Sequence, residues 1–295
     1  MATLEEIQQP IADKVRRYET FITEILHSDS GYVSSICNYI LANRGKQMRP
    51  LLVLLSAALH GEIGTRSYLG ASLVEMLHTA SLIHDDVVDE AFVRRGAPSV
   101  NALWRSHTAV LIGDYIFART YHVCMEQGGD DMLSEATRSV HEMSEGELTQ
   151  TELSESLRMT RELYLDIIYK KTASLLAACG AIGAISVNAT PEQIKAMRDF
   201  GTNLGIAFQI KDDILDFSPM EVTGKPIGKL SDIRQRPANV DYLARTVRER
   251  GGLEHAATVM TQYRDKALTS LENYPESPVR ESMRRFADFV LERNK

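Results

Sequence analysis

The sequence predicts an all-α protein, a single large bundle of about ten or more helices around a central cavity. Apolar residues recur with helical periodicity along almost the whole chain. No segment alternates apolar and polar residues in the manner of a half-buried strand. Several predicted helices are longer than 20 residues and apolar on more than one face, as helices buried within a bundle are. We therefore expect residues 1–295 to form one domain.

Local signals place the helices along the chain. Pro50 stands where the first turn of a helix tolerates proline, and an apolar run follows until Gly61 and Gly64 close the helix. Further helices are expected over 68–92, 99–126, 130–153, 160–187, 190–217, 238–250, 253–271 and 278–292. The segment Arg95-Gly-Ala-Pro98 ends the first of these, and the Pro-, Gly- and Lys-rich segment 218–229 predicts a loop.

The composition restricts the class of ligand. With 25% charged residues and a formal net charge of −7, the chain has no general positive field that would hold nucleic acid. Its most apolar runs are too short to span a bilayer, so we expect no integral membrane association. Three scattered cysteines, Cys37, Cys124 and Cys179, predict buried small side chains in a reducing compartment, and no signal peptide is visible. We expect a cytoplasmic protein that binds any anion through local Lys and Arg residues or through a metal ion.

Two acidic clusters carry the chemistry. Both read Asp-Asp-x-x-Asp within an apolar helix, and they comprise Asp85, Asp86 and Asp89, then Asp212, Asp213 and Asp216. Carboxylates four residues apart lie on one helix face and repel each other, so a partly buried cluster needs a counter-charge. Mg²⁺ supplies one, because it binds one or two carboxylates together with substrate phosphates. A solvated acidic face is the plain alternative for one cluster, but two clusters on different helices favour metal sites that face each other across a cavity.

The residues around these clusters match a known family. The matching stretches are Gly45-Lys-Gln-Met-Arg-Pro50, residues 75–86, Arg94-Arg95-Gly96, Gly113-Asp114, Glu145-Gly-Glu147 with Gln150, Lys171-Thr172 and residues 208–213. On this basis the chain resembles the all-trans polyprenyl diphosphate synthases, which are trans-prenyltransferases. The resemblance covers roughly residues 33–228 in order and spacing.

The resemblance implies a reaction. The family condenses isopentenyl diphosphate with an allylic prenyl diphosphate, head to tail and trans, and releases pyrophosphate. It implies that Mg²⁺ ions held by the six aspartates clamp the allylic diphosphate, with Asp85, Asp89 and Asp212 as the most direct ligands. It also implies a homodimer.

The resemblance also assigns residues to the substrates. Lys46, Arg49, His78 and Arg95 match the isopentenyl diphosphate site, Arg94 matches an allylic diphosphate contact, and Lys211 and Lys225 add cations for diphosphate. The residues matched to catalysis near the reacting carbons are Lys171, Thr172 and Gln209. Each also has an ordinary structural interpretation. Arg94 and Arg95 could cap a helix C-terminus, Lys171 could face water beside Lys170, and His78 could be a satisfied core histidine.

Helix geometry leads to a prediction of product length. Ala80 and Ser81 precede Asp85 by about one helical turn, which rises 5.4 Å, and Leu77 lies one level deeper. Family members that stop early place a bulky ring at the first level, where this chain has a methyl and a hydroxymethyl group. We therefore expect the growing chain to stop deeper, with Leu77 and Tyr115 among the candidate residues that limit it. The predicted product is longer than farnesyl diphosphate, in the range of quinone side chains.

One segment departs from the family. After Gly228 the usual Gly-Lys-x-Thr-Leu-Pro stretch is absent, which indicates either a true deletion or a loop omitted between Gly228 and Lys229. We favour the second, because a lid that closes on Mg-diphosphate is a segment that orders only with ligand. Two other functions stay open: a class I terpene cyclase, and a non-catalytic regulatory subunit of a heteromeric synthase. The isopentenyl diphosphate residues and the all-Asp second cluster count against the cyclase. The presence of both Asp clusters counts against the regulatory subunit, which a true deletion would favour.

Overall fold

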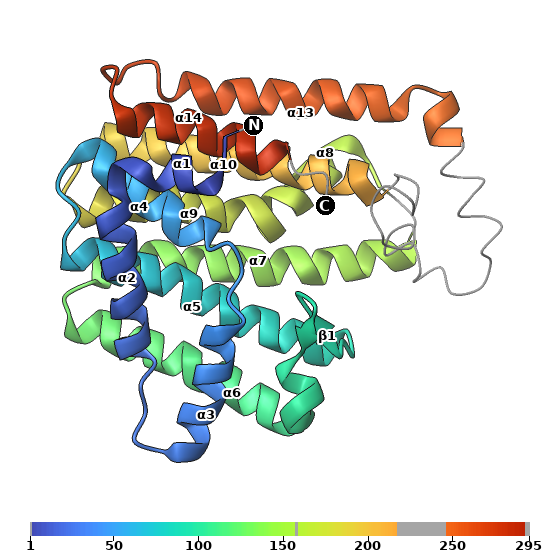
Figure 1. Cartoon of the computed structure of the whole chain (residues 1–295). Helices are drawn as coiled ribbons and strands as arrows, with labels where there is room; N and C mark the ends of the chain where they lie inside the picture. The colour runs from blue at the N-terminus through green and yellow to red at the C-terminus, as the bar shows by residue number, and fades with distance from the viewer. Residues whose placement is uncertain (1, 157–158, 217–245, 293–295) are drawn as a thin grey trace. The chain divides into compact units, whose positions relative to one another are not determined.

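The computed structural model describes residues 2–156, 159–216 and 246–292, and it confirms the all-α prediction (Figure 1). The predicted loop 218–229 and most of the predicted helix 238–250 lie outside the described residues. The described helices are α1 (Leu4–Gln8), η1 (Gln9–Ile11), α2 (Ala12–Ile25), α3 (Gly31–Ala42), α4 (Met48–His60), α5 (Thr65–Val88), α6 (Val100–Glu126), α7 (Asp130–Ser156), α8 (Arg161–Ile168), η2 (Tyr169–Ala173), α9 (Ser174–Ser186), α10 (Pro191–Asp216), α13 (Gly252–Thr269) and α14 (Pro278–Leu291).

The chain divides into two compact units, each described here by itself. Unit 1 comprises Met1–Ile7, Glu142–Ala177 and Asp199–Lys295, and unit 2 comprises Gln8–His141 and Ala178–Arg198. The first Asp cluster therefore lies in unit 2 and the second in unit 1. The expectation of one domain stays a prediction.

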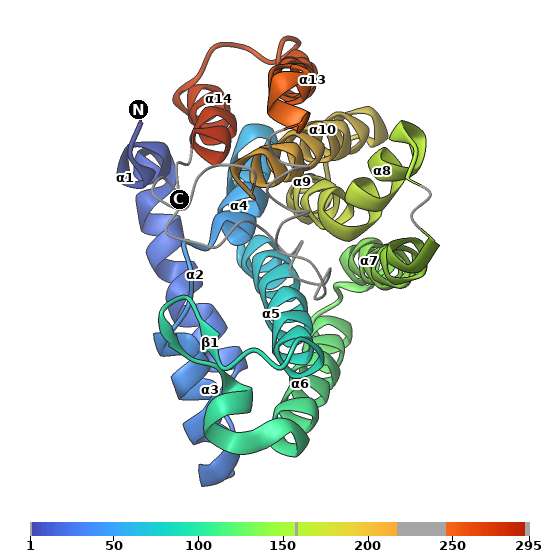
Figure 2. The same cartoon turned by 90° about the vertical axis from the view of Figure 1, so that its right-hand side faces the viewer.

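Helix α5 is the central element of unit 2, where it packs against α2, α4 and α6 (Figure 2). Nearly all of its first half is buried, which explains why the sequence shows apolar or small residues on every face. Close helix approach depends on Gly183, where a Cβ would come within 2.3 Å of the Val53 carbonyl oxygen of α4. The hydroxyl of Ser56 also donates to the Gly180 carbonyl oxygen at 2.7 Å. These contacts hold α4 beside the part of α9 that belongs to unit 2.

A small hairpin follows α5, and here the expectation of no strands is wrong. Strands β1 (Val93–Arg94) and β2 (Ala97–Pro98) pair antiparallel. Arg95 and Gly96 form the turn with φ values of 55° and 78°, the left-handed conformation that two-residue hairpin turns require. Strands of two residues are too short to show alternation in the sequence. Their role is to direct the Arg94 and Arg95 side chains.

In unit 1, helix α10 packs closely on the helical run α8–η2–α9. A Cβ at Gly205 would lie 2.5 Å from the Ala173 Cα, and one at Gly201 would lie 2.1 Å from the Leu176 carbonyl oxygen. Beside these contacts lies an apolar cluster formed by Ile168, Ala173, Ile206, Ile210 and Val259. Helices α13 and α14 pack along each other in the same unit (Figure 1).

Two helix predictions need correction in detail. Gly61 ends α4, but Gly64 is the N-cap of α5 and so begins the next helix rather than closing the previous one. The helix predicted over 160–187 is interrupted by η2, a π-helical turn at Tyr169–Ala173. A π turn inserts one extra residue into an α-helix and is frequent at functional sites.

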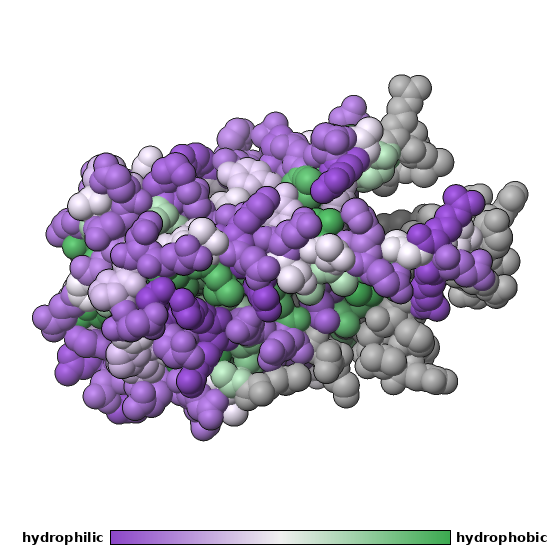
Figure 3. Space-filling view, turned by 90° about the horizontal axis from the view of Figure 1, so that it is seen from above, coloured by the Kyte–Doolittle hydropathy of each residue, from purple (hydrophilic) through white to green (hydrophobic). Residues whose placement is uncertain are grey.

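Surface and core agree with the composition. Hydrophilic residues cover most of the face seen in Figure 3, and hydrophobic residues show there as small separate patches. Among the described residues, no helix has both the length and the apolar character needed to cross a membrane. Cys37, Cys124 and Cys179 are free and buried, as predicted.

Candidate active site

The first Asp cluster lies at the C-terminal end of α5. Asp85 and Asp89 are exposed, and the Asp89 backbone N–H donates to the Asp85 carbonyl oxygen at 2.8 Å as the helix ends. His84, just before them, lies against Gly113 of α6, where a Cβ would come within 2.2 Å of the His84 Nε2. The same nitrogen lies 3.2 Å from the Val110 carbonyl oxygen. Two accessible carboxylates one turn apart are thus presented from an anchored helix end.

Asp86, the middle member of the cluster, has a different environment. It is buried and forms an ion pair with Arg94, whose Nε and Nη2 lie 2.7 Å and 2.5 Å from Oδ1. The buried Asn101 side chain donates to the Asp86 carbonyl oxygen at 3.3 Å. Arg94 therefore does not cap the C-terminus of α5 in this structure; the hairpin directs it onto Asp86.

A cation-rich region in unit 2 brings the predicted isopentenyl diphosphate residues together. The Arg95 guanidinium carbon lies 2.6 Å from the position that a Cβ on Gly45 would take, so this side chain lies directly against the Gly45–Lys46 segment. Desolvation lowers the pKa of His78 well below 6.5, and the positive charges of Arg49, Arg95 and Arg94 lower it further. The buried Nδ1 of His78 has no hydrogen-bond partner among the described residues, which argues against the satisfied core histidine that the sequence also allowed.

Glu75 is the buried acid of this region. Desolvation raises the pKa of its carboxyl, while the positive charges of Arg49, Arg95 and Arg44 act to lower it. Since Glu75 is one carboxyl among several cations, the region keeps an excess of positive charge.

Several buried polar atoms of the same region lack a hydrogen-bond partner among the described residues. They are Arg44 Nη1, Gln47 Nε2 and His78 Nδ1. Such atoms are costly to leave unsatisfied, so a native structure that leaves several together calls for a specific explanation. A multivalent anion such as a diphosphate has the charge and the acceptor oxygens that would satisfy them.

The second Asp cluster is held by a hydrogen-bonded chain within unit 1. The Tyr164 hydroxyl donates to Asp213 Oδ2 at 2.5 Å, and the Gln209 amide donates to Asp213 Oδ1 at 3.0 Å. The Thr172 hydroxyl donates in turn to the Gln209 amide oxygen at 2.7 Å. Burial raises the pKa of Asp213, although the hydrogen bonds from Tyr164 and Gln209 act to lower it. The structure thus joins two predicted catalytic residues to one predicted metal ligand.

Lys171 is held by α7. Its Nζ lies 2.6 Å from Glu147 Oε2 and donates to Gln150 Oε1 at 3.0 Å. Gly146 permits this contact, since a Cβ there would come within 2.8 Å of the Lys170 Cβ. Lys171 therefore does not simply face water, because Glu147 and Gln150 make polar contacts with it from another helix.

The remaining predicted residues occupy varied environments. Leu77 and Ala80 are buried in α5, whereas Ser81 is partly exposed and donates its hydroxyl to the His78 carbonyl oxygen at 2.9 Å. Tyr115 is partly buried in α6, which packs on α5. Lys211 and Asp212 are partly buried and Asp216 is exposed, whereas Lys225 lies outside the described residues.

A metal ion would need ligands beyond any single cluster. In the described part of the chain, no three His, Cys, Asp or Glu side chains are grouped closely enough to hold a metal ion by themselves. This fits Mg²⁺, which typically keeps several waters and takes one or two carboxylates plus substrate phosphates. The predicted donor set consists of carboxylate oxygens without sulfur or imidazole, which suits the same hard cation.

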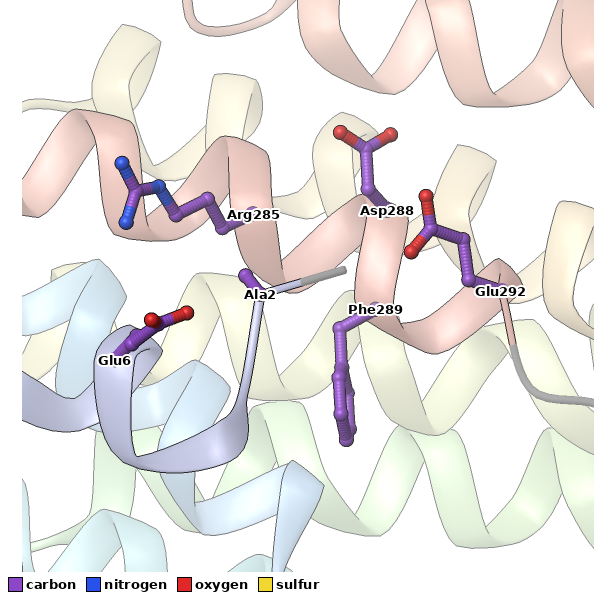
Figure 4. A pocket seen from close by; sticks show the side chains of 6 residues that line it. All are labelled: Ala2, Glu6, Arg285, Asp288, Phe289 and Glu292. Atoms are coloured by element: carbon purple, nitrogen blue, oxygen red, sulfur yellow. The ribbon is translucent and has the colours of Figure 1, made fainter.

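A separate pocket in unit 1 contains none of these residues. Arg285, Asp288, Phe289 and Glu292 of α14 line it together with Ala2 and Glu6 (Figure 4). None of the predicted site residues lines this pocket.

The sequence did not identify Tyr164, and it did not indicate that two uncharged side chains hydrogen-bond Asp213. Tyr164 precedes the Lys171-Thr172 pair by seven residues on a helix with no other unusual residue, so spacing alone gave no signal. The Glu145-Gly-Glu147 stretch did give one, because a glycine between two acids within a helix indicates close approach by another element.

Comparisons with known proteins identify the family. Residues 30–248 match the sequence model for Polyprenyl synthetase. An all-trans-nonaprenyl-diphosphate synthase (geranyl-diphosphate specific) from Rhodobacter capsulatus is 31% identical, and the match covers 98% of each chain. A short chain isoprenyl diphosphate synthase from Methanothermobacter thermautotrophicus is 33% identical, over 96% of this chain and 98% of that protein.

A solved structure extends the comparison to the fold. The crystal structure of polyprenyl synthase from Caulobacter crescentus CB15, complexed with calcium and isoprenyl diphosphate, superposes with a TM-score of 0.88 at 29% identity. The match covers 99% of this chain and 98% of that one. The chain belongs to the polyprenyl synthetase family and is a trans-prenyltransferase. The predictions of fold, family and enzyme class are confirmed.

The comparisons also concern the length of this chain relative to its relatives. The two alignments extend over 318 and 323 positions, which exceeds the 295 residues of this chain. The relatives therefore contain residues with no counterpart here. Gly228 and Lys229 themselves lie outside the described residues.

Proposed function

We propose that the protein condenses isopentenyl diphosphate with an allylic prenyl diphosphate in the presence of Mg²⁺, releasing pyrophosphate and a polyprenyl diphosphate longer than farnesyl. We further propose that the chain acts as one domain, in the cytoplasm, as a homodimer. The observation that supports the substrate class most strongly is the cation-rich region of unit 2 with its unsatisfied buried polar atoms. A protein of net charge −7 has little reason to gather these cations except to bind an anion.

Isopentenyl diphosphate is assigned to that region. Lys46, Arg49, His78 and Arg95 would bind its diphosphate, with Arg44 and Gln47 adding donors. Because the polar atoms are buried already, ligand binding replaces unsatisfied groups with charge-assisted hydrogen bonds and little reorganisation.

The allylic diphosphate is assigned to the aspartates through metal ions. Asp85 and Asp89 in unit 2, and Asp212, Asp213 and Asp216 in unit 1, would hold Mg²⁺, with Asp86 in support. When bound, Mg²⁺ neutralises the charge that develops on the leaving diphosphate as its C–O bond breaks. Lys211 and Lys225 would add positive charge to the same diphosphate.

Thr172, Gln209 and Lys171 are assigned to the reacting carbons. An allylic cation needs dipoles near it and no strong nucleophile, and the Thr172 hydroxyl and Gln209 amide are neutral dipoles held by each other. Lys171 is held by Glu147 and Gln150, so its position is set before substrate arrives. The departing pyrophosphate is the proposed acceptor of the final proton.

The relatives support the substrate class but differ in product length, so we infer product length from the pocket residues of this chain. One relative is named for a nonaprenyl product and another as a short chain synthase, while the Caulobacter crescentus structure contains isoprenyl diphosphate. In this chain Ala80 and Ser81 place small side chains one turn below Asp85. This absence of a bulky group supports a product longer than farnesyl diphosphate.

The direct test is product formation from farnesyl diphosphate and radiolabelled isopentenyl diphosphate with Mg²⁺, followed by separation of products by chain length. We expect labelled polyprenyl diphosphates. A terpene cyclase would release unlabelled hydrocarbon, and a regulatory subunit would incorporate label only with a partner. No incorporation, alone or with candidate partner subunits, would reject the proposal.

Product length has its own test. Ser81→Phe is expected to shorten the main product by one or more isoprene units, because the ring would close the first level of the pocket. Ala80→Phe should act in the same direction, at a stability cost of about 1–3 kcal/mol because Ala80 is fully buried. Ser81→Thr is the matched control and should leave chain length unchanged. An unaltered product distribution in both Phe variants would show that α5 does not limit chain length at this level.

A further inference from the structure

Asp213 differs from an ordinary carboxylate in that neutral donors occupy both of its oxygens. The Tyr164 hydroxyl binds Oδ2 at 2.5 Å and the Gln209 amide binds Oδ1 at 3.0 Å. A neutral donor fixes the direction of a carboxylate without cancelling its negative charge, whereas an arginine would do both. Each oxygen keeps a second lone pair that points elsewhere. Asp213 is therefore oriented by groups that do not neutralise its charge.

The donors are themselves fixed. Thr172 donates to the Gln209 amide oxygen at 2.7 Å, which leaves the amide nitrogen of Gln209 directed at Asp213. Gln209 and Asp213 are four residues apart on α10 and so share a face. On the facing helical run α8–η2–α9, Tyr164 contacts Asp213 and Thr172 contacts Gln209.

The π turn explains how Tyr164 and Thr172 both reach that face. The two residues are eight apart, so in a regular α-helix they would point about 80° away from each other. The π turn η2, which begins after Tyr164 and includes Thr172, has more residues per turn than an α-helix and so reduces this angle. The two side chains therefore lie more nearly on one face than a regular α-helix would place them. Gly205 opposite Ala173 lets the two helices lie close enough for these short hydrogen bonds.

We propose that Tyr164 is a positioning residue that orients Asp213 for a divalent cation, and that the π turn η2 keeps it in register with Thr172. This inference rests on the proposed function, in which Asp213 belongs to the metal-binding set. Tyr164 touches neither substrate nor metal; it acts through Asp213.

The test is the affinity for Mn²⁺, a hard divalent ion that substitutes for Mg²⁺, measured by electron paramagnetic resonance in the presence of inorganic pyrophosphate. Tyr164→Phe keeps the ring and removes the hydroxyl. We expect it to raise the Kd for Mn²⁺ about tenfold, the usual cost of removing the hydrogen-bond partner of a metal ligand. The matched control is Tyr263→Phe, which removes a hydroxyl from another ring packed on the same apolar cluster and should leave the Kd unchanged.

A double-mutant cycle with Asp213→Asn separates positioning from a general structural effect. If Tyr164 acts through Asp213, adding Tyr164→Phe to Asp213→Asn changes the Kd no further. Equal effects in both backgrounds, or an unchanged Kd in Tyr164→Phe alone, would overturn the inference while leaving the proposed function intact. Wild-type affinity in Asp213→Asn would instead show that the metal assignment itself fails, and the inference with it. Thermal melting of each variant checks that the fold is retained.

Discussion

The two Asp-Asp-x-x-Asp clusters have the same sequence pattern but different middle carboxylates. Asp86 in unit 2 is buried against a full positive charge, the Arg94 guanidinium. Asp213 in unit 1 is held by a phenol and an amide, neither of which carries charge. An arginine therefore pairs with the middle aspartate of the first cluster, whereas uncharged side chains hydrogen-bond the middle aspartate of the second.

The difference shows that equal motifs do not imply equal roles. Asp86 joins the hairpin to the end of α5 through its ion pair with Arg94, whereas Asp85 and Asp89 are the exposed carboxylates of that cluster. Asp213 is held instead by hydrogen bonds from Tyr164 and Gln209.

The largest expected effect separates the members of the first cluster. Asp85→Asn should lower kcat/KM by about 10³-fold, because it removes an exposed carboxylate that would hold the metal ion. Asp86→Asn should lower it only about tenfold, because Arg94 already balances Asp86. Steady-state kinetics at saturating Mg²⁺ measures both. Equal losses would mean that Asp86 also acts directly on the metal, and the contrast drawn above would fail.

A smaller effect is expected on stability. Arg94→Leu leaves the buried Asp86 carboxylate unpaired and should lower the free energy of unfolding by about 2 kcal/mol, less than for a fully buried pair because the Arg94 side chain is 36% exposed. Urea unfolding measures it. Adding Asp86→Asn should recover most of the loss. A fully stable Arg94→Leu protein would indicate that Arg94 serves substrate alone.

The smallest expected effect is on the pH dependence of stability, and it comes from His78, which is buried near several arginines. Because its folded pKa lies well below 6.5, the unfolded chain binds the proton more tightly. The stability that His78 contributes is thus present above pH 6.5 and is lost as the pH falls from there towards the folded pKa. His78→Asn should flatten this part of the pH dependence of urea unfolding.

Inorganic pyrophosphate provides the companion measurement for His78. An anion beside the arginines would raise the pKa of His78, so it should also flatten the curve of the wild-type protein. Parallel pH curves for the wild type and His78→Asn, both without pyrophosphate, would show that folding does not lower the pKa of His78.

Much of the fold followed from the sequence because its signals are local. Pro191 and Pro278 both begin helices, as proline in a first turn allows, and apolar periodicity located the long central elements. The hairpin could not be predicted, because Arg95 adopts a positive φ that its residue type does not indicate. Likewise, η2 could not be predicted, and two of its residues, Lys171 and Thr172, contact α7 and α10, which are distant in the sequence.

The sequence identified candidate site residues but not the contacts that they form with one another and with their neighbours. Asp86 and Arg94 were both identified from the sequence, yet assigned to different ligands, because eight residues of separation across a helix end do not reveal an ion pair. Lys171 was identified without its partners, since Glu147 and Gln150 belong to another helix. Partners that meet only through tertiary packing are beyond what spacing along one chain can show.

The contact between Gly113 and His84 has an evolutionary consequence. Because the imidazole occupies the volume that any side chain on Gly113 would need, the two positions constrain each other. A larger residue in α6 at this point is tolerable only alongside a smaller one before Asp85. Natural variants are therefore expected to exchange the pair together, and alanine substitutions meant to stiffen α6 should leave this glycine in place.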